Sequence, residues 1–186
     1  MIGFIKRLFA RRDEIANDVA RILEEERERY YNMKTEELLA LPDEELLGVM
    51  WMRMVRFSAR FDSERRALDN MDDEQKNFYT AYYYMLQMNA GGLCQYFANS
   101  SRESALFLSD ALEHVGADEH RVLFESFLHH NKVATAAMFS FAVIDSEEYR
   151  KMERDYPFEE FNSTFYAIEP LTEPLAAYVR ENIGAF

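Results

Sequence analysis

Two adjacent glycines, Gly91 and Gly92, interrupt a segment that is otherwise aromatic and helical in character. A glycine in a helix interior costs roughly 1 kcal/mol relative to alanine, so the pair indicates a break, a sharp turn or a close backbone contact. Amides and hydroxyls follow the pair, and such side chains satisfy the backbone groups that a break leaves open. We therefore expect an interrupted helix here.

Apolar residues recur at steps of three and four on both sides of the glycines, and no alternating strand pattern of useful length appears. The chain has 186 residues, enough for one well-buried core. We therefore predict an all-α fold, a single multi-helix globular domain with an N-terminal helical extension. The extension covers residues 1–67 and packs on the core, and residues 68–186 form an acidic all-α domain.

Local signals predict several helix ends. Asp43 and Asp72 are suited to N-caps. Ser100 and Glu103 have the spacing of a capping box, and Gly116 is placed to end a helix in the left-handed conformation. Residues 118–144 are rich in apolar side chains and form one broken helix or two. Of the three consecutive tyrosines at 82–84, at least one should present its hydroxyl at a surface or to a polar partner.

The net charge of −13 is distributed unevenly along the chain. Residues 1–67 hold 13 Lys/Arg against 14 Asp/Glu, whereas residues 68–186 hold 8 against 20, a net of −12. A field of this sign repels nucleic acid and anionic lipid and favours cationic partners, such as the basic face of a DNA-binding protein. Solubility is the ordinary alternative, and acids at helix starts also stabilise the helix dipole.

Three acids, Glu103, Asp110 and Glu113, fall on one side of a predicted helix, opposite its apolar stripe. Carboxylates three or four residues apart on a helix lie about 5–6 Å apart at their Cβ atoms, within range of the phosphate spacing of a nucleic-acid strand. We predict that these three residues bind a partner.

The sequence predicts no catalytic residue, metal site or cofactor. Cys94 is the single cysteine, which excludes a disulfide or a Cys-based zinc site within one chain and fits a reducing cytoplasm. The four histidines lack the spacing of a zinc motif, and the glycine pair lacks the Lys and Ser/Thr of a phosphate-binding loop. We predict that the protein is not an enzyme.

The first twelve residues are basic and amphipathic but lack the apolar core and cleavage site of a signal peptide. We expect them to form a helical turn docked on the domain, with anchoring to a membrane surface as the alternative. No segment approaches the ~20 apolar residues that cross a bilayer, so we predict no membrane span.

At the glycine motif the chain resembles the C-terminal domain of a bacterial DNA-mimic protein family, long known as a domain of unknown function. The resemblance covers roughly residues 68–186, including the Gly116-Ala117 helix end and the closing segment from Phe161. The matching motif residues are Asn89, Gly91, Gly92, Gln95, Tyr96, Phe97, Asn99 and Ser100. The chain departs from the family pattern at Gln87, Ala90 and Leu93.

The resemblance implies an all-helical, often dimeric domain that imitates DNA and occupies a DNA-binding protein. The leading hypothesis is accordingly a cytoplasmic, non-enzymatic interaction protein that binds a basic or DNA-binding protein and does not bind nucleic acid directly. In this hypothesis the motif residues are structural. The alternative is a small-molecule-binding or enzymatic helical domain with a pocket at Gly91-Gly92, Gln95, Tyr96 and Asn99. A third hypothesis is a structural role in which the N-terminal helix pairs with a second copy to form a homodimer.

Overall fold

A computed structural model describes residues 24–133, 143 and 145–186. Every regular element among these residues is a helix, so the all-α prediction is confirmed. The chain divides into two compact units, one ending at Ala40 and one spanning Leu41–Phe186. The predictions for residues 1–12, and for the apolar segment 134–142, lie outside the described residues.

The described part of the first unit contains two helical stretches. Residues 24–31 are helical, and α2 spans Thr35–Leu39. At the start of α2 the Lys34 N–H donates to the Glu37 carboxylate at 2.8 Å, which satisfies one of the amides that a helix leaves open at its first turn.

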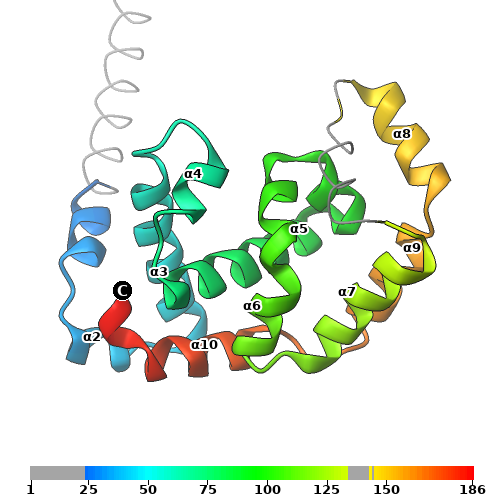
Figure 1. Cartoon of the computed structure of the whole chain (residues 1–186). Helices are drawn as coiled ribbons and strands as arrows, with labels where there is room; N and C mark the ends of the chain where they lie inside the picture. The colour runs from blue at the N-terminus through cyan, green and yellow to red at the C-terminus, as the bar shows by residue number, and fades with distance from the viewer. Residues whose placement is uncertain (1–23, 134–142, 144) are drawn as a thin grey trace, which may run out of the picture. The chain divides into compact units, whose positions relative to one another are not determined.

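The second unit contains the other helices (Figure 1). In chain order they are α3 (Asp43–Ser58), α4 (Glu64–Leu68), α5 (Asp73–Ala98), the 3₁₀ helix η1 (Ser100–Phe107), α6 (Leu108–His114), α7 (Asp118–His130), α8 (Ser146–Asp155), α9 (Phe158–Phe165), α10 (Thr172–Glu181) and the short 3₁₀ helix η3 (Ile183–Ala185). Helix α3 and the first four residues of α4 precede residue 68 in the chain, and both helices belong to this unit.

Helix α5 is the central element of the second unit, since η1, α3, α6, α8, α9 and α10 all pack against it. Its aromatic side chains form much of the core: Phe78, Tyr84, Tyr96 and Phe97 are fully buried. Phe97 continues this packing to α7 and α9 through Phe124 and Phe158. The aromatic residues that flank the glycine pair therefore build the core.

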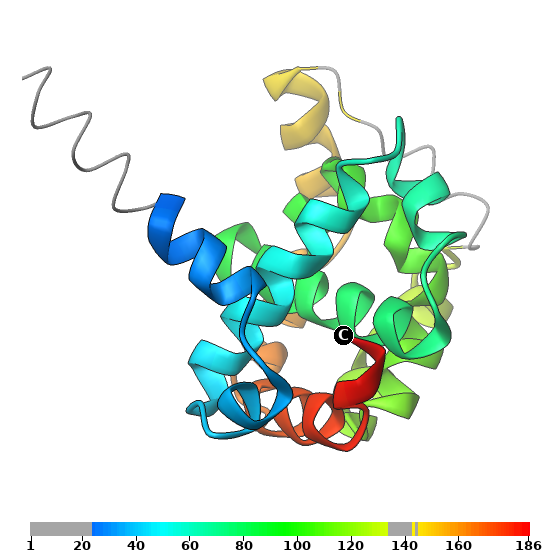
Figure 2. The same cartoon turned by 90° about the vertical axis from the view of Figure 1, so that its left-hand side faces the viewer.

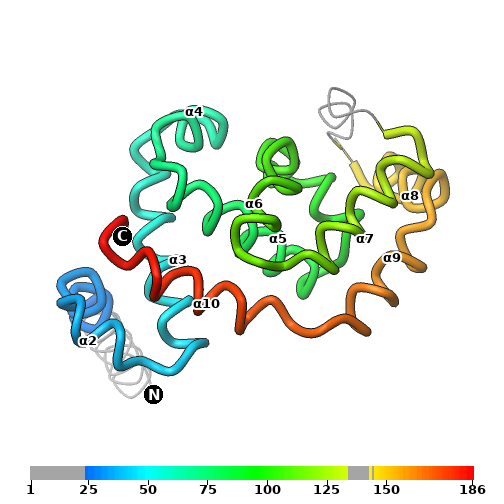
Figure 3. Tube along the Cα trace, turned by 60° about the horizontal axis from the view of Figure 1, so that its bottom comes forward, coloured from blue at the N-terminus to red at the C-terminus, as the bar shows by residue number. Residues whose placement is uncertain are grey.

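The end of the chain returns to the start of the unit. Helix α10 leads from α9 back to α3 and packs against it, as Figure 3 shows. The chain ends beside the start of α5, and Figure 2 marks this C-terminus. The Gln75 side chain donates to the Ala185 carbonyl at 2.6 Å, and the Phe186 ring packs edge-on against Phe78. Arg180 of α10 pairs with Asp43 at the start of α3, with 2.7 Å between Nη1 and Oδ1. These contacts hold the end of the chain against α3 and the start of α5.

Two of the predicted helix ends are confirmed. Asp72 is the N-cap of α5 and forms a capping box with Gln75. Gly116 follows α6 with a φ of 74°, and the Ala117 N–H donates to the Leu112 carbonyl at 2.8 Å. The third differs by one residue, because α3 begins at Asp43 and its N-cap is Pro42.

The three tyrosines at 82–84 also behave as predicted. Tyr82 and Tyr84 are buried, whereas Tyr83 is half-buried and its hydroxyl interacts with the side chains of Ser100 and Ser101. The hydroxyl oxygen of Tyr84 is buried and has no hydrogen-bond partner, and the same holds for Thr80. Tyr84 lies between the rings of Tyr96, Phe124 and Phe165.

We expect Tyr84→Phe to raise the free energy of unfolding by about 1 kcal/mol, because it removes a buried hydroxyl that has no partner and keeps the ring. Tyr96→Phe is the matched variant. The Tyr96 hydroxyl bonds Ser104 Oγ at 3.0 Å, so its removal should lower the free energy of unfolding by about 1 kcal/mol. Urea unfolding of the two variants measures the difference, and equal effects would contradict the assignment.

Candidate functional site

The glycine pair bends α5, as the sequence predicts. Gly92 lies inside the helix with φ 78° and ψ −170°, a conformation that side-chain-bearing residues rarely adopt. Two groups from the α9 region satisfy the backbone near the bend. The Asn162 side chain accepts from the Leu93 N–H at 3.0 Å, and the Tyr166 hydroxyl donates to the Met88 carbonyl at 2.6 Å. The bend is therefore stabilised by residues far away in the sequence.

The space beside each glycine is filled. A Cβ on Gly92 would lie 2.7 Å from the Cγ of Asn162, and a Cβ on Gly91 would lie 2.8 Å from the Cδ of Gln95. Gln95 in turn donates to Gln87 at 3.2 Å, and Asn99 donates to the same Gln87 oxygen at 2.8 Å. Two amides of the motif thus bond to Gln87, on the other side of the bend.

The remaining motif residues also bond within the chain. The Ser104 hydroxyl, which bonds Tyr96, donates to the Ser101 carbonyl at 2.7 Å, and the Ser101 hydroxyl donates to the Tyr96 carbonyl at 2.8 Å. Ser100 is exposed and its hydroxyl interacts with the Glu64 carboxyl. Asn89 is exposed on α5.

The predicted capping box at Ser100 and Glu103 is wrong. The residue that precedes η1 is Asn99, and no side chain caps this helix. The Glu103 carboxylate instead accepts from the Arg65 N–H of α4 at 2.8 Å. This bond satisfies an amide at the start of α4, so a contact between helices takes the place of the local one.

The three acids predicted to bind a partner lie on two elements rather than on one helix. Glu103 belongs to η1, whereas Asp110 and Glu113 lie on α6 and are exposed. Glu103 is half-buried because it packs against α4. Asp110 and Glu113 remain predicted partner residues, and the premise that all three share one helix face is corrected.

The thiol of Cys94 is buried and interacts with the Tyr149 side chain. Burial raises the pKa of Cys94 to about 11, because a thiolate would be poorly solvated there. The thiol is therefore protonated at neutral pH, and a protonated thiol is a weak nucleophile.

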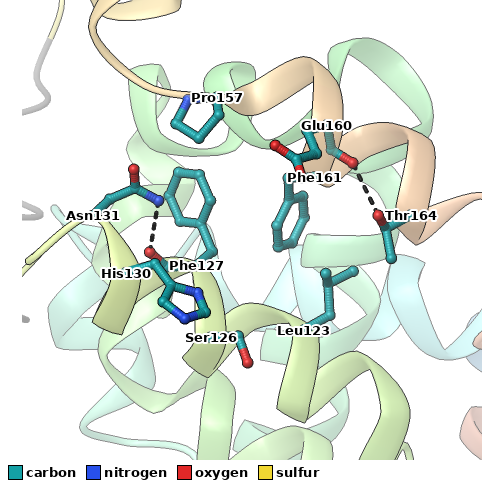
Figure 4. A pocket seen from close by; sticks show the side chains of 9 residues that line it. All are labelled: Leu123, Ser126, Phe127, His130, Asn131, Pro157, Glu160, Phe161 and Thr164. Atoms are coloured by element: carbon teal, nitrogen blue, oxygen red, sulfur yellow. Dashed lines mark hydrogen bonds between the residues drawn. The ribbon is translucent and has the colours of Figure 1, made fainter.

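Two hollows bear on the small-molecule alternative. An open hollow of about 550 Å³ is lined by Gln95 and Asn99 of the motif together with Asp145, Ser146 and Tyr149 at the start of α8. A second, of about 340 Å³, lies between α7 and α9, where Phe127 and Phe161 face each other (Figure 4).

Two of the polar side chains that line the second hollow are occupied. Asn131 donates to the Phe127 carbonyl at 2.9 Å, and Thr164 donates to the Glu160 carbonyl at 3.0 Å (Figure 4). Three polar side chains of the first hollow are occupied as well, since Gln95 and Asn99 donate to Gln87, and Asp145 accepts from the amides of Glu147 and Glu148.

Glu64 is a residue that the sequence analysis missed. Burial, and then the neighbouring Glu103 carboxylate, raise the pKa of Glu64 to about 8. Its Oε1 atom is buried and has no hydrogen-bond partner. In the sequence Glu64 stands in a charged run, Asp62 to Arg66, which is typical of a solvent-exposed helix start, so no local signal identifies it.

Within the described residues, no group of three or more His, Cys, Asp and Glu side chains could hold a metal ion. Likewise, none of the described helices is long and apolar enough to cross a membrane.

Comparison with known families identifies the segment from α5 to α10. The model of the DMP19-like protein family matches residues 69–182, more than half of the 186-residue chain. The chain belongs to the DMP19-like protein family. Comparisons with curated proteins and with solved structures gave no significant match.

The DMP19-like segment carries the features described above. It includes the bent helix α5, the whole glycine motif and Asn162, which fills the bend. It also holds 20 Asp/Glu and 8 Lys/Arg, the same net charge of −12 that the sequence analysis found in the second part of the chain. The predicted membership of the DNA-mimic family is thereby confirmed.

Proposed function

We propose that this protein is a cytoplasmic, non-enzymatic interaction protein that occupies the nucleic-acid-binding surface of a basic, DNA-binding protein. Its carboxylates would take the place of DNA phosphates. The family match supports a DNA-mimic role. The observation that carries the proposal is the location of the charge: in the matched segment 18 of the 20 acidic residues are exposed, but only four of the eight basic residues.

This distribution makes the surface more acidic than the composition suggests. Four of the basic residues are half-buried, and each of them bonds to a nearby carboxylate or carbonyl: Lys76, Arg102, Arg121 and Arg180. Exposed acids thus outnumber exposed bases in the matched segment, and a field of this kind attracts the cationic surfaces that bind DNA phosphates.

The test is competition with DNA. The full chain is immobilised, and a nuclease-treated lysate of the source organism is passed over it at low salt. We expect a DNA-binding protein to be retained and identified by mass spectrometry. A short DNA duplex should then release it, because a DNA mimic and DNA use the same basic surface. Raising the salt concentration should weaken the complex as the Debye length falls.

Two results would overturn the proposal. One is that no DNA-binding protein is retained at low salt. The other is a ternary complex in which the retained protein binds this chain and the DNA duplex together.

A further inference from the structure

The α6–α7 turn, the start of α7, the α9–α10 connection and the start of α10 lie close together (Figure 1). With Glu44 of α3, they line a groove of about 760 Å³. Five carboxylates line it, and no lysine or arginine is among its lining residues: Glu44, Asp118, Glu119, Glu169 and Glu173. All five are exposed. We call this feature the acidic groove.

The negative charge of the acidic groove is mostly unpaired. Asp118 forms an ion pair with Arg121, with 3.0 Å between the Oδ1 and Nη2 atoms. The other four carboxylates form no ion pair with another described residue. Four of the five lie in first turns of α3, α7 and α10, where each helix end offsets about half a charge. Several negative charges therefore remain in the groove.

Stabilisation of a helix start explains why each of these four acids lies where it does along the chain. It does not explain why all four line the same groove. Like charges gathered in one groove raise one another's energy, and Glu169 lies between helices, where it stabilises no helix dipole. A cationic ligand would remove this repulsion.

His120 also lines the acidic groove, and one of its ring nitrogens has no hydrogen-bond partner. It is only 3% exposed, and its Nε2 lies 2.9 Å from the Glu169 carbonyl oxygen. A carbonyl oxygen only accepts, so Nε2 carries the hydrogen, and the neutral ring then has a lone pair on Nδ1. Burial lowers the pKa of His120, which keeps the ring neutral. Nδ1 has no hydrogen-bond partner.

The lining of the acidic groove also includes apolar residues from both connections and from α10: Ala117, Ile168, Pro170, Pro174 and Ala177. Apolar side chains, several carboxylates and one unpartnered acceptor together match a ligand with an aliphatic stem and several N–H donors. Arginine and lysine side chains have this composition, and arginine offers the donors in a planar fork that fits carboxylates.

We propose that the acidic groove receives arginine or lysine side chains from a basic segment of a protein partner. This inference rests on the proposed function, for which it names the place of contact. In this arrangement the guanidinium or ammonium groups pair with Glu119, Glu169 and Glu173, and one N–H group donates to His120 Nδ1.

The test compares two variants of equal charge. The groove variant carries Glu119→Gln, Glu169→Gln and Glu173→Gln. The control variant carries Glu147→Gln, Glu153→Gln and Glu159→Gln, three exposed acids of α8 and α9 that do not line the groove. The probe is a fluorescein-labelled nine-residue peptide of alternating arginine and glycine, and its binding to the full chain is followed by fluorescence anisotropy at low salt.

We expect the groove variant to bind the peptide about tenfold more weakly than the wild type, since three exposed charge contacts are worth about 0.5 kcal/mol each. The control variant should lose about threefold or less. Equal losses of affinity in the two variants would show that the acidic groove is not the binding site. Unchanged binding in the groove variant would show the same. The proposed function is tested separately, by the competition with DNA.

The ¹⁵N chemical shift of His120 Nδ1 tests the proposed hydrogen bond directly, apart from general charge attraction. In ¹⁵N spectra of the wild-type protein, the Nδ1 signal of His120 should shift on saturation with the peptide, because its lone pair gains a donor. The signal should keep its position in the presence of an equal concentration of sodium chloride. A Nδ1 signal that the peptide leaves unmoved contradicts the proposed hydrogen bond and the binding mode built on it.

Discussion

Gly92→Ala should lower the free energy of unfolding by about 3–5 kcal/mol. Three costs add at this position: backbone strain of about 1–3 kcal/mol at the positive φ, displacement of the Asn162 side chain, and loss of the hydrogen bond that Asn162 accepts from Leu93. Urea unfolding followed by circular dichroism measures the change. Because α5 contacts most helices of the second unit, the whole unit should lose stability together.

Alanine substitutions at two other glycines measure the backbone cost without a steric clash. Gly116 also has a positive φ of 74°, but nothing lies within 4 Å of a Cβ placed there, so Gly116→Ala should cost only about 1–2 kcal/mol. Gly48 lies in α3 with open space around it, and Gly48→Ala should change stability by about +0.5 to +1 kcal/mol. A Gly92→Ala variant no less stable than Gly116→Ala would show that Asn162 does not matter at the bend.

The sequence predicted the features that depend on neighbouring residues. A glycine pair inside an aromatic helix is costly, so an interruption near Gly91 and Gly92 followed from local energetics alone. The N-cap at Asp72 and the helix end at Gly116 were predicted for the same reason. The sequence could not tell which glycine of the pair takes the positive φ, because that depends on where α9 packs.

The features that the sequence missed depend on contacts between distant segments. Asn162 meets Leu93, and Tyr166 meets Met88, across about 70 and 80 residues of chain. The local pattern at Ser100 and Glu103 was that of a capping box, but Glu103 bonds to α4 because η1 packs there. The acidic groove could not be predicted from the sequence either. Its acids come from three helix starts and a connection that are well separated in the sequence.

The same packing of η1 on α4 leads to the second large effect, at Glu64. The pKa of its carboxyl is about 8 in the folded protein against an ordinary value of 4.5, because the carboxylate is poorly solvated and lies near Glu103. Between these two pH values the folded state holds a proton that the unfolded state releases. The contribution of Glu64 to the free energy of unfolding therefore falls as the pH rises from about 4.5 to about 8, by up to about 1.4 kcal/mol per pH unit.

Glu64→Gln should remove this dependence, because glutamine resembles the protonated carboxyl and cannot ionise. At pH 8 the variant should be more stable than the wild type by roughly 2–4 kcal/mol, and at pH 5 the two should be nearly equal. Urea unfolding of both proteins at pH 5, 6, 7 and 8 provides the measurement. The difference between the two proteins isolates Glu64, because every other ionisable group is the same in both.

Glu113→Gln is the control, since Glu113 is exposed on α6 and its replacement should leave the pH dependence of the wild type unchanged. The assignment fails if Glu64→Gln tracks the wild type at every pH, or if it loses stability at pH 8, because either result means that the carboxylate is stabilised in the folded protein. If the difference instead grows with pH as expected, the α4–η1 contact holds a carboxyl that is neutral at pH 7. The acidity available for binding a basic partner then comes from the exposed carboxylates alone, and Glu64→Gln should strengthen the fold without weakening the binding of the arginine peptide.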